Sequence, residues 1–414
     1  MTNTSNSELT CRFCGTPFTT SFANLGETPL ANSYLSDASQ PDPHYPLHAR
    51  VCDNCLLVQV EDVVPPEDIF TDYAYFSSFS TSWVAHAEAY TRMATEQFGL
   101  GASSSVIEVA SNDGYLLQHF VKAGIPVLGI EPAVNVAATA NANGVETLPA
   151  FFGLELARKL RAEGRSADLL LGNNVLAHVP DLNDFVAGLA HLLAQDGVLT
   201  MEFPHLARLI EDAQFDTIYH EHFSYFSLLV VERVFAKHGL RLFDVEELPT
   251  HGGSLRIFAA RTNGPERSEG AGLAKVRDDE ASMALGDIRS YAGFQARVEA
   301  IRDGLKSFLY SAQRDGKTVA AYGAAAKGNT LLNFCGVDAS QLAFVADVSD
   351  QKQGKLLPGS RVPIVAPNRL RDMRPDYVLI LPWNLSREIT AAHDYVTEWG
   401  GQFVIAVPEL TILQ

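Results

Sequence analysis

Two pairs of closely spaced cysteines constrain the fold of this chain more than any other feature of the sequence. Cys11 and Cys14 form one CxxC pair, and Cys52 and Cys55 form the other. Each pair can present two thiolates to one metal ion from a tight turn, and two pairs complete a tetrahedral zinc shell. Because thiolates would fill all four ligand positions, we expect a structural zinc ion that stabilises the loop-rich segment between the pairs.

The composition restricts the kind of protein and its partners. With 414 residues, 47% of them hydrophobic and 19% charged, the chain is expected to form two or three globular domains. The formal net charge of −18 argues against nucleic acid or an anionic membrane as the main partner. No apolar run approaches the roughly 18 residues of a membrane span, and the paired cysteines indicate a reducing compartment. The cytoplasm is therefore the expected location, with no membrane partner.

A first α/β sheet is predicted after the second cysteine pair. A buried strand at 105–110 is followed by the small-residue turn Ser111–Gly114 and by a helix that begins near Tyr115, which is the first βα unit of a nucleotide-binding sheet. Further strands are predicted at 127–132, 168–174 and 197–204. Acidic, amide or imidazole side chains recur after these strands, at Glu131, Asn173, Asn174 and His178. Open parallel sheets bind ligands at that edge.

A second α/β sheet is predicted near the end of the chain, with strands at 317–322, 342–347 and 377–384. The loop after its first strand contains small residues and Lys327 before a helix. Backbone amides and a cation in such a loop can approach phosphate oxygens. The P-loop order GxxxxGK[ST] is absent. The alternative is a domain that only braces the first sheet.

Between the two sheets lies the run Tyr219-His220-Glu221-His222, which is flanked by apolar and aromatic residues. Histidine has an unperturbed pKa of about 6.5, and a neighbouring carboxylate can fix its tautomer and prepare it as a base. One interpretation is a general-base centre. The other is a hydrogen-bonded aromatic loop, and these four residues alone do not decide between them.

Other segments are less specific. The aromatic and hydroxyl run 73–80 precedes a helix predicted from Trp83 to about Phe98, and could line a polar ligand pocket or pack as a linker. His251-Gly252-Gly253-Ser254 could be a tight turn before an edge strand or a loop that closes over substrate. Residues 263–280 are expected to form an exposed connection, followed by a helical stretch at 283–315.

Taken together, these motifs resemble the class I S-adenosylmethionine-dependent methyltransferases, and over nearly the whole chain the nucleotide-deoxysugar C-methyltransferases of the sugar 3-C-methyltransferase type. The resemblance implies an α/β protein with a small N-terminal zinc-binding domain, a central class I methyltransferase (Rossmann-like) domain and a C-terminal Rossmann-like α/β domain. The expected boundaries are 1–72 for the zinc-binding domain, 73–265 for the methyltransferase domain, 266–305 for a helical connection, and 306–414 for the C-terminal domain, which helps to hold the nucleotide-linked sugar.

The resemblance also implies roles for individual residues. His222 is the expected base, with Tyr219, Glu221 and His178 around the reacting face and His220 pointing away, although the two histidines could exchange roles. The expected adenosylmethionine-binding residues are Glu108, Ala110, Ser111, Asn112, Asp113, Gly114, Glu131, Pro132, Asn173 and Asn174. The expected substrate-binding residues are Tyr75, Phe76, Ser78, Tyr225, Lys327, Asn329, Asp347, Lys355 and Trp383.

The implied substrate is a nucleotide-linked 4-keto-deoxysugar, with dTDP as the expected nucleotide, and the implied reaction forms an enolate that takes the methyl group on carbon. A monomer or weak homo-oligomer is expected. Two rival functions stay open on the sequence: an O- or N-methyltransferase on another phosphorylated small molecule, and a non-catalytic zinc-containing nucleotide-binding protein. An NAD-dependent dehydrogenase is disfavoured, because Ala110 stands where a GxGxxG fingerprint needs its first glycine.

Overall fold

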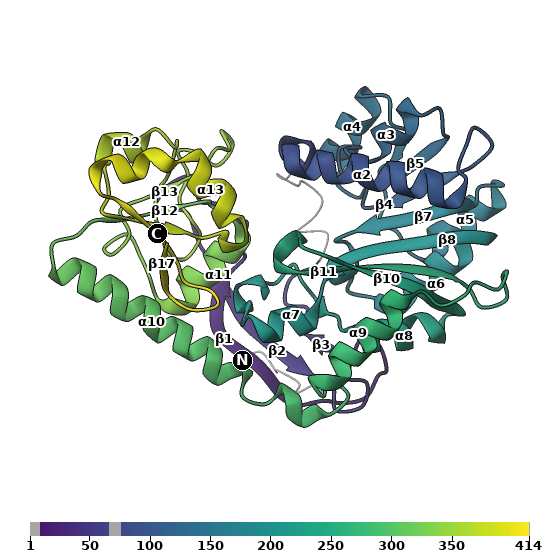
Figure 1. Ribbon diagram of the computed structural model, residues 1–414, viewed down its shortest axis with the longest axis horizontal. Coiled ribbons are helices and arrows are strands. Elements are labelled where there is room, and N and C mark those ends of the chain that lie inside the picture. Colours follow the sequence, from purple (N-terminus) through teal and green to yellow (C-terminus); the bar gives the residue numbers. More distant parts are fainter. Residues whose placement is uncertain (1–8, 66–75, 414) are drawn as a thin grey trace.

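The computed structural model describes residues 9–65 and 76–413, which form three β-sheets with helices around two of them (Figure 1). The smallest sheet has the strand order β1-β2-β3-β9 and is antiparallel throughout. Its strands are β1 (Ser21–Pro29), β2 (His44–Val51), β3 (Val58–Gln59) and β9 (Ser224–Tyr225). Three of these strands come from the N-terminal segment, but β9 directly follows the Tyr219–His222 run. The zinc-binding domain and that run are therefore joined by strand pairing.

The central sheet has seven strands in the order β10-β11-β8-β7-β4-β5-β6. The bounds are β4 (Val106–Val109), β5 (Val127–Ile130), β6 (Thr147–Leu148), β7 (Ala167–Asn173), β8 (Leu193–Pro204), β10 (Leu240–Leu248) and β11 (Ser254–Arg261). Six of the seven strands run in the same direction, and only β11, between β10 and β8, is antiparallel to both of its neighbours. The helices of this domain are α2 (Thr81–Phe98), α3 (Leu117–Lys122), α4 (Val134–Ala142), α5 (Leu154–Ala162), α6 (Leu182–Leu192), α7 (Leu206–Glu211) and α8 (Leu228–Lys237). The predicted methyltransferase fold is confirmed.

The predicted strands of this sheet end within a few residues of the observed ones. Apolar runs such as Asp168–Asn174 pack between helices on both faces, so their central residues are almost completely buried. The helix predicted from Trp83 to Phe98 is α2, and Ser80 caps it by accepting a hydrogen bond from the Trp83 amide.

The C-terminal sheet has the order β14-β13-β12-β15-β16-β17, and only β17 is antiparallel. Its strands are β12 (Val319–Tyr322), β13 (Val345–Ala346), β14 (Ile364–Val365), β15 (Tyr377–Ile380), β16 (Gln402–Ile405) and β17 (Thr411–Leu413). Its helices are α11 (Ala326–Cys335), α12 (Arg369–Met373) and α13 (Ser386–Ala392). The predicted second Rossmann-like domain is thereby confirmed.

The connection between the two large sheets differs from the prediction. The expected exposed connection at 263–280 contains most of helix α9 (Ala271–Ser282), and Leu273 and Val276 on this helix are buried. Glu280 is also buried and accepts hydrogen bonds from the first two amides of α8. The charged residues of α9 conceal a narrow apolar stripe, which is why the prediction was wrong. The expected helix at 283–315 is interrupted, and α10 (Phe294–Arg314) begins only after Gly293.

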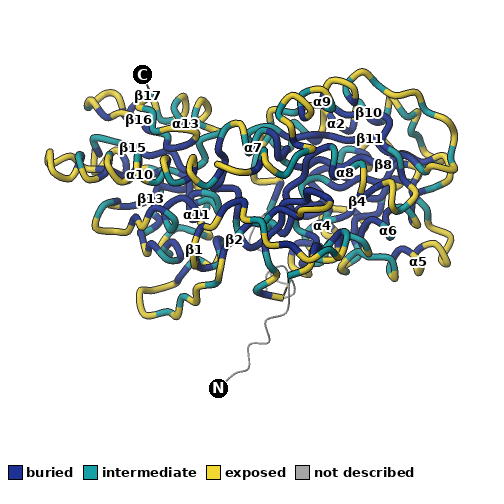
Figure 2. Tube along the Cα trace, turned by 90° about the horizontal axis from the view of Figure 1, so that it is seen from below, coloured by how far each residue is buried: buried dark blue, intermediate teal, exposed yellow. Residues whose placement is uncertain are grey.

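The two large lobes meet at the N-terminal sheet, where β1 runs beside α10 and α11 (Figure 1). Phe22 on β1 stacks on Phe294 at the start of α10, with ring centroids 4.3 Å apart. Buried chain extends through both lobes and through the N-terminal sheet between them (Figure 2). Among the described helices we find none that is both long and apolar enough to cross a membrane.

Candidate active site and zinc site

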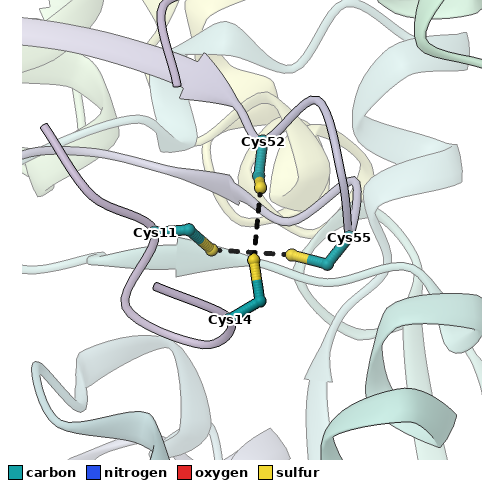
Figure 3. A group of neighbouring side chains, drawn as sticks. All are labelled: Cys11, Cys14, Cys52 and Cys55. Carbon is teal, nitrogen blue, oxygen red and sulfur yellow. Dashed lines mark hydrogen bonds between the residues drawn. The ribbon is translucent and has the colours of Figure 1, made fainter. Parts of the chain in front are cut away.

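The four cysteines of the CxxC pairs converge at one point (Figure 3). The Sγ atoms of Cys11 and Cys55 are 3.5 Å apart, as are those of Cys14 and Cys52, and all four lie within 4.8 Å of one another. Zinc–sulfur bonds of about 2.3 Å in a tetrahedron place the sulfurs about 3.8 Å apart, so the geometry fits one zinc ion. Four thiolates close the coordination shell. The ion is therefore structural, as the sequence predicted.

The loop after β4 has the shape of a cofactor-binding turn. Ala110 and Asn112 have positive φ angles of 56° and 49°, and Gly114 follows at 78°. The two oxygens of Glu131, after β5, accept hydrogen bonds from the Asn112 and Ala133 amides at 3.0 and 2.9 Å. A Cβ atom on Gly129 would lie 2.4 Å from Ser111 Oγ, so this strand can approach the loop only with glycine.

Carboxyl groups and amides with unmet hydrogen-bonding capacity gather at this edge of the central sheet. Within the described residues, neither oxygen of Glu108 has a hydrogen-bond partner, nor has Oδ1 of Asp113 or the side-chain amide of Asn173. Burial raises the pKa of Glu108 well above its usual value, and the nearby charges of Glu131 and Asp113 raise it further. Adenosylmethionine carries a sulfonium and an ammonium group. The positive charges of these two groups complement the carboxyl groups gathered at this edge. Pro132 lies half-buried directly after Glu131.

His222 is held at two points. Its Nδ1 is 2.8 Å from the Thr217 carbonyl oxygen, which can only accept, so Nδ1 carries the proton and Nε2 keeps its lone pair. The Tyr219 hydroxyl lies 2.8 Å from Nε2 and donates to it. Burial, followed by the charge of His178, lowers the pKa of His222 well below its usual value. The imidazole is therefore neutral at pH 7, with the lone pair on Nε2 available.

The structure places the other residues of the predicted catalytic group as follows. The His178 ring meets the His222 ring edge to face, with centroids 4.7 Å apart, and burial lowers its pKa to about 4. The Tyr225 ring is 6.2 Å from His222. Glu221 accepts a hydrogen bond from Asn32 at 2.7 Å, so it ties the segment to the N-terminal domain. His220 lies 3.2 Å from the Pro46 carbonyl oxygen, on the side of that domain.

The structure adds His251, which the sequence left undecided. It has a positive φ of 56° in the turn before β11, and its Nε2 is 3.2 Å from Nδ2 of Asn174, which also has a positive φ. Although His251 is exposed to solvent, partial desolvation by the surrounding protein lowers its pKa. Residues with left-handed backbone that contact one another are candidates for function. The His-Gly-Gly-Ser run was the available signal, but its place beside Asn174 is a tertiary feature.

A second cluster of charged and aromatic side chains lies beside His251. Glu202, at the end of β8, accepts two hydrogen bonds from Arg256, at 2.8 and 2.6 Å, and lies 2.9 Å from His86 Nε2. The His86 ring stacks on Trp83, and Trp83 also meets His251 edge to face. Burial acts to raise the pKa of Glu202, but His86 and Arg256 outweigh it and lower that pKa. This network fixes the position of Trp83, which His251 contacts.

The C-terminal domain contributes a cation near His222 and His251. Lys327, in the first turn of α11, donates to Asn384 at 3.0 Å and lies over the Trp383 ring, and its charge acts on His222 and His251. The Trp383 indole donates to Asp216 at 2.8 Å, just before the Tyr219–His222 run. Asp216 is fully buried, and burial raises its pKa to about 6.

Three other predicted substrate residues of this domain lie elsewhere. Asn329 is buried and donates to the Ala31 carbonyl oxygen, so it holds the N-terminal segment. Asp347, directly after β13, accepts from the Ala324 amide at 2.7 Å and so holds the loop between β12 and α11, while Lys355 is half-buried further along the chain. The binding roles of these three residues stay predictions.

The predicted aromatic segment is only partly described. Tyr75 lies outside the described residues. The amides of Ser77 and Ser78 donate to Asn112 and Asp113, at 2.8 and 3.3 Å, and Phe76 stacks on Phe79 with centroids 5.4 Å apart. This segment therefore lies against the cofactor loop.

The seven-stranded sheet with its polar carboxyl edge defines an adenosylmethionine-dependent methyltransferase. Three protein-family profiles match the chain, and their descriptions are "Putative zinc binding domain" over residues 11–70, "Methyltransferase domain" over 84–245 and "C-methyltransferase C-terminal domain" over 249–408. The C-methyltransferase NovU from Streptomyces niveus is 38% identical over 405 residues, which are 97% of this chain and 96% of that protein. The chain belongs to this C-methyltransferase family, and it is an adenosylmethionine-dependent C-methyltransferase with a zinc-binding N-terminal domain.

Two solved structures that resemble the chain each overlap with less than half of it. Magnesium protoporphyrin IX methyltransferase from Synechocystis with bound SAM is 15% identical, with a TM-score of 0.33 over 46% of this chain and 86% of that one. The PH0226 protein from Pyrococcus horikoshii is 16% identical, with a TM-score of 0.37 over 47% of this chain and 97% of that one. The rival O- or N-methyltransferase and non-catalytic functions are set aside on the family match.

Proposed function

We propose that this enzyme methylates a nucleotide-linked 4-keto-deoxysugar, with dTDP as the expected nucleotide, at the carbon next to the ketone, and that His222 is the base. The observation that carries the proposal is the hydrogen-bonding of His222, whose Nδ1–H donates to Thr217 and whose Nε2 has its lone pair on the side of the Tyr219 hydroxyl. A carbon next to a ketone becomes a nucleophile only after it loses a proton. A neutral imidazole held in one tautomer suits that task.

Tyr219 is proposed to stabilise the charge that develops on the keto oxygen. Its hydroxyl now donates to His222 Nε2, the atom that must face the substrate C–H bond. When the sugar occupies that position, the hydroxyl is displaced from Nε2 and can donate to the oxyanion instead. The proton from carbon then resides on His222, and His178 lies against the same ring, where it can orient it.

Lys327 is proposed to bind the diphosphate of the substrate. It is a cation in the first turn of a helix, and that end of a helix favours anions. The chain as a whole carries a net charge of −18, so a cation directed at the histidine cluster gives a diphosphate a defined place to bind. Trp383 and Asn384 hold its ammonium group from the same domain.

The cofactor edge completes the site. Adenosylmethionine supplies an electrophilic methyl group when it is bound there. Glu131 is proposed to accept hydrogen bonds from ribose hydroxyls with the lone pairs that its two backbone amides leave free. Glu108 and Asp113 are proposed to attract the positive charges of the cofactor.

The experiment is mass spectrometry of products after incubation with adenosylmethionine and a panel of nucleotide-linked deoxysugars. Each 4-keto sugar is paired with its 4-hydroxy counterpart, which cannot form an enolate. The proposal predicts a product one methyl group heavier only from 4-keto members, with the methyl group on carbon by NMR. Equal methylation of a keto sugar and its hydroxy counterpart would contradict the enolate route.

A further inference from the structure

We propose that Arg12 and Gln59, next to the zinc site, are positioning residues that set the geometry of the two loops carrying His178 and His222. The inference rests on the proposed function for the roles of those histidines. It goes beyond it by giving the zinc-binding domain a part in catalysis, although its metal shell is closed.

Arg12 lies between the first two cysteines and reaches both loops. Its guanidinium donates to the carbonyl oxygens of Pro180, at 2.9 Å, and Val60, at 2.6 Å. It also lies over the Phe223 ring, 5.4 Å from the centroid. Pro180 is two residues after His178, and Phe223 directly follows His222. Only 9% of the Arg12 side chain is exposed, so one buried cation fixes the main chain beside both histidines.

Gln59 links the metal ligands to the same loops. Its Nε2 donates to Cys11 Sγ at 3.2 Å, and its Oε1 accepts from the Arg12 amide at 3.0 Å. Gln59 is only 2% exposed and pairs with Ser224 between β3 and β9. A hydrogen bond to a thiolate ligand orients that ligand and is part of the metal site. A single residue, Gln59, therefore connects the Cys11 thiolate with the strand that follows the Tyr219–His222 run.

The two loops are also joined to each other and to the zinc-held turn. The Phe223 amide donates to the Ala177 carbonyl oxygen at 2.7 Å, and the Val60 amide donates to the Phe223 carbonyl oxygen at 3.1 Å. From α6, Asn183 donates to the carbonyl oxygens of Arg12 and Phe13, each at 2.9 Å. The turn is thus held by the methyltransferase domain on one side and holds its catalytic loops on the other.

This arrangement separates two parts of the enzyme. The cofactor loop lies after β4 and β5, and its contacts with Glu131 do not involve the zinc-binding domain. The spacing of 4.7 Å between the His178 and His222 rings depends on loops that Arg12 connects. Disturbing Arg12 or Gln59 should therefore affect turnover far more than adenosylmethionine binding.

The test compares Arg12→Gln and Gln59→Leu with the matched control Arg261→Gln. Arg261 also donates to two main-chain carbonyl oxygens, of Ala190 and Leu193, but at the start of β8, at the opposite edge of the central sheet. The measurements are zinc content, hydrogen exchange of segments 177–180 and 219–225, kcat, and KM for adenosylmethionine. If Arg12→Gln does not fold, Arg12→Lys, which keeps the charge without the fork, takes its place.

We expect Arg12→Gln to keep its zinc and its KM for adenosylmethionine, to exchange faster in both segments, and to lose about 10- to 100-fold in kcat. Gln59→Leu should in addition lose zinc to a competing chelator about 10- to 100-fold more readily. Arg261→Gln should do neither. Unchanged exchange in both segments would overturn the inference whatever happens to kcat. Because exchange and zinc retention do not depend on turnover, the inference is tested even if His222 proves not to be the base.

Discussion

His222 can act as a base only if Nε2 keeps its lone pair, and the Thr217 carbonyl oxygen secures this by accepting a hydrogen bond from Nδ1–H. The same logic gives Tyr219 two successive partners. Its hydroxyl donates to Nε2 at 2.8 Å in the absence of substrate, and to the keto oxygen in the proposed reaction. At the scale of single residues, the proposed site pairs a donor, the Tyr219 hydroxyl, with an acceptor, Nε2 of His222. In the proposed reaction the substrate separates the two.

Tyr219→Phe tests this exchange of partners. The variant keeps the ring beside His222 but has no hydroxyl to donate to the developing oxyanion, so we expect kcat to fall about 100-fold. The affinity for adenosylmethionine, measured by titration calorimetry, should not change. Tyr310→Phe, at an exposed tyrosine, is the control. A Tyr219→Phe enzyme with more than half of the normal kcat would remove the hydroxyl from the proposed mechanism.

The pH dependence follows from the lowered histidine pKa values. His178 has a pKa of about 4, and that of His222 is well below its usual value, both chiefly because of burial. In the unfolded chain these groups bind protons below about 6.5, but in the folded chain they do so only at lower pH. The contribution of these two histidines to the free energy of unfolding should therefore fall as the pH falls from about 6.5 toward 4.

The same shifts keep the base unprotonated, so kcat should be maintained between pH 8 and 6 and should decline only below that. Stopped-time assays and urea unfolding across this range check both expectations. A kcat that is already halved at about pH 6.5 would show that His222 titrates normally.

At the scale of elements, the short strand β9 fixes the position of the Tyr219–His222 run. It begins two residues after His222 and pairs with β3 of the N-terminal sheet. A two-residue strand has no periodic pattern, so the sequence could not reveal this pairing. The long strands were predictable because apolar runs such as 168–174 have no other stable location than the interior of a parallel sheet.

Helix α9 shows the opposite failure. Its many charged residues suggested an exposed connection, but Leu273, Val276 and Glu280 lie on one buried face. Glu280 is buried because it accepts the free amides of α8 and lies 2.7 Å from His205. Burial of a charged residue that caps a distant helix is a tertiary effect, and no local pattern predicts it.

The zinc site gives an element-scale prediction. The purified protein should contain about one zinc ion per chain, because four thiolates complete one tetrahedral shell. Cys14→Ser should lower the zinc content and the melting temperature together. Cys335→Ala, which removes the cysteine in α11 that lies outside the cluster, should keep its zinc. Elemental analysis that finds no zinc in the unaltered protein would contradict the four-thiolate site.

At the scale of the whole molecule, the proposed active site is assembled from all three domains. The methyltransferase domain holds the histidines, the N-terminal domain contacts their loops, and the C-terminal domain holds Lys327 and Trp383. The sequence predicted the metal site, the cofactor edge and the Tyr-His-Glu-His run, because each is a local pattern. It could not predict that Trp383 meets Asp216, since nothing local relates residues of different domains.

Trp383→Phe tests that contact. The Trp383 indole is a donor to the fully buried carboxyl of Asp216, so its loss leaves a buried acceptor short of a partner and should lower the free energy of unfolding by about 1–3 kcal/mol. Trp399→Phe is the matched control, because that indole donates to Pro375 within the C-terminal domain. Urea unfolding measures both variants. Equal losses of unfolding free energy in the two variants would show that the hydrogen bond between domains stabilises the protein no more than the one within the C-terminal domain.

The most direct test of the central claim measures proton removal without methyl transfer. The enzyme, a nucleotide-linked 4-keto-deoxysugar and adenosylhomocysteine are incubated in deuterated water, and NMR follows deuterium entering the carbon next to the ketone. If His222 is the base, the unaltered enzyme should exchange this hydrogen, and His222→Ala should do so about 100- to 10,000-fold more slowly while binding adenosylhomocysteine normally. Exchange at the normal rate in His222→Ala would show that another group removes the proton.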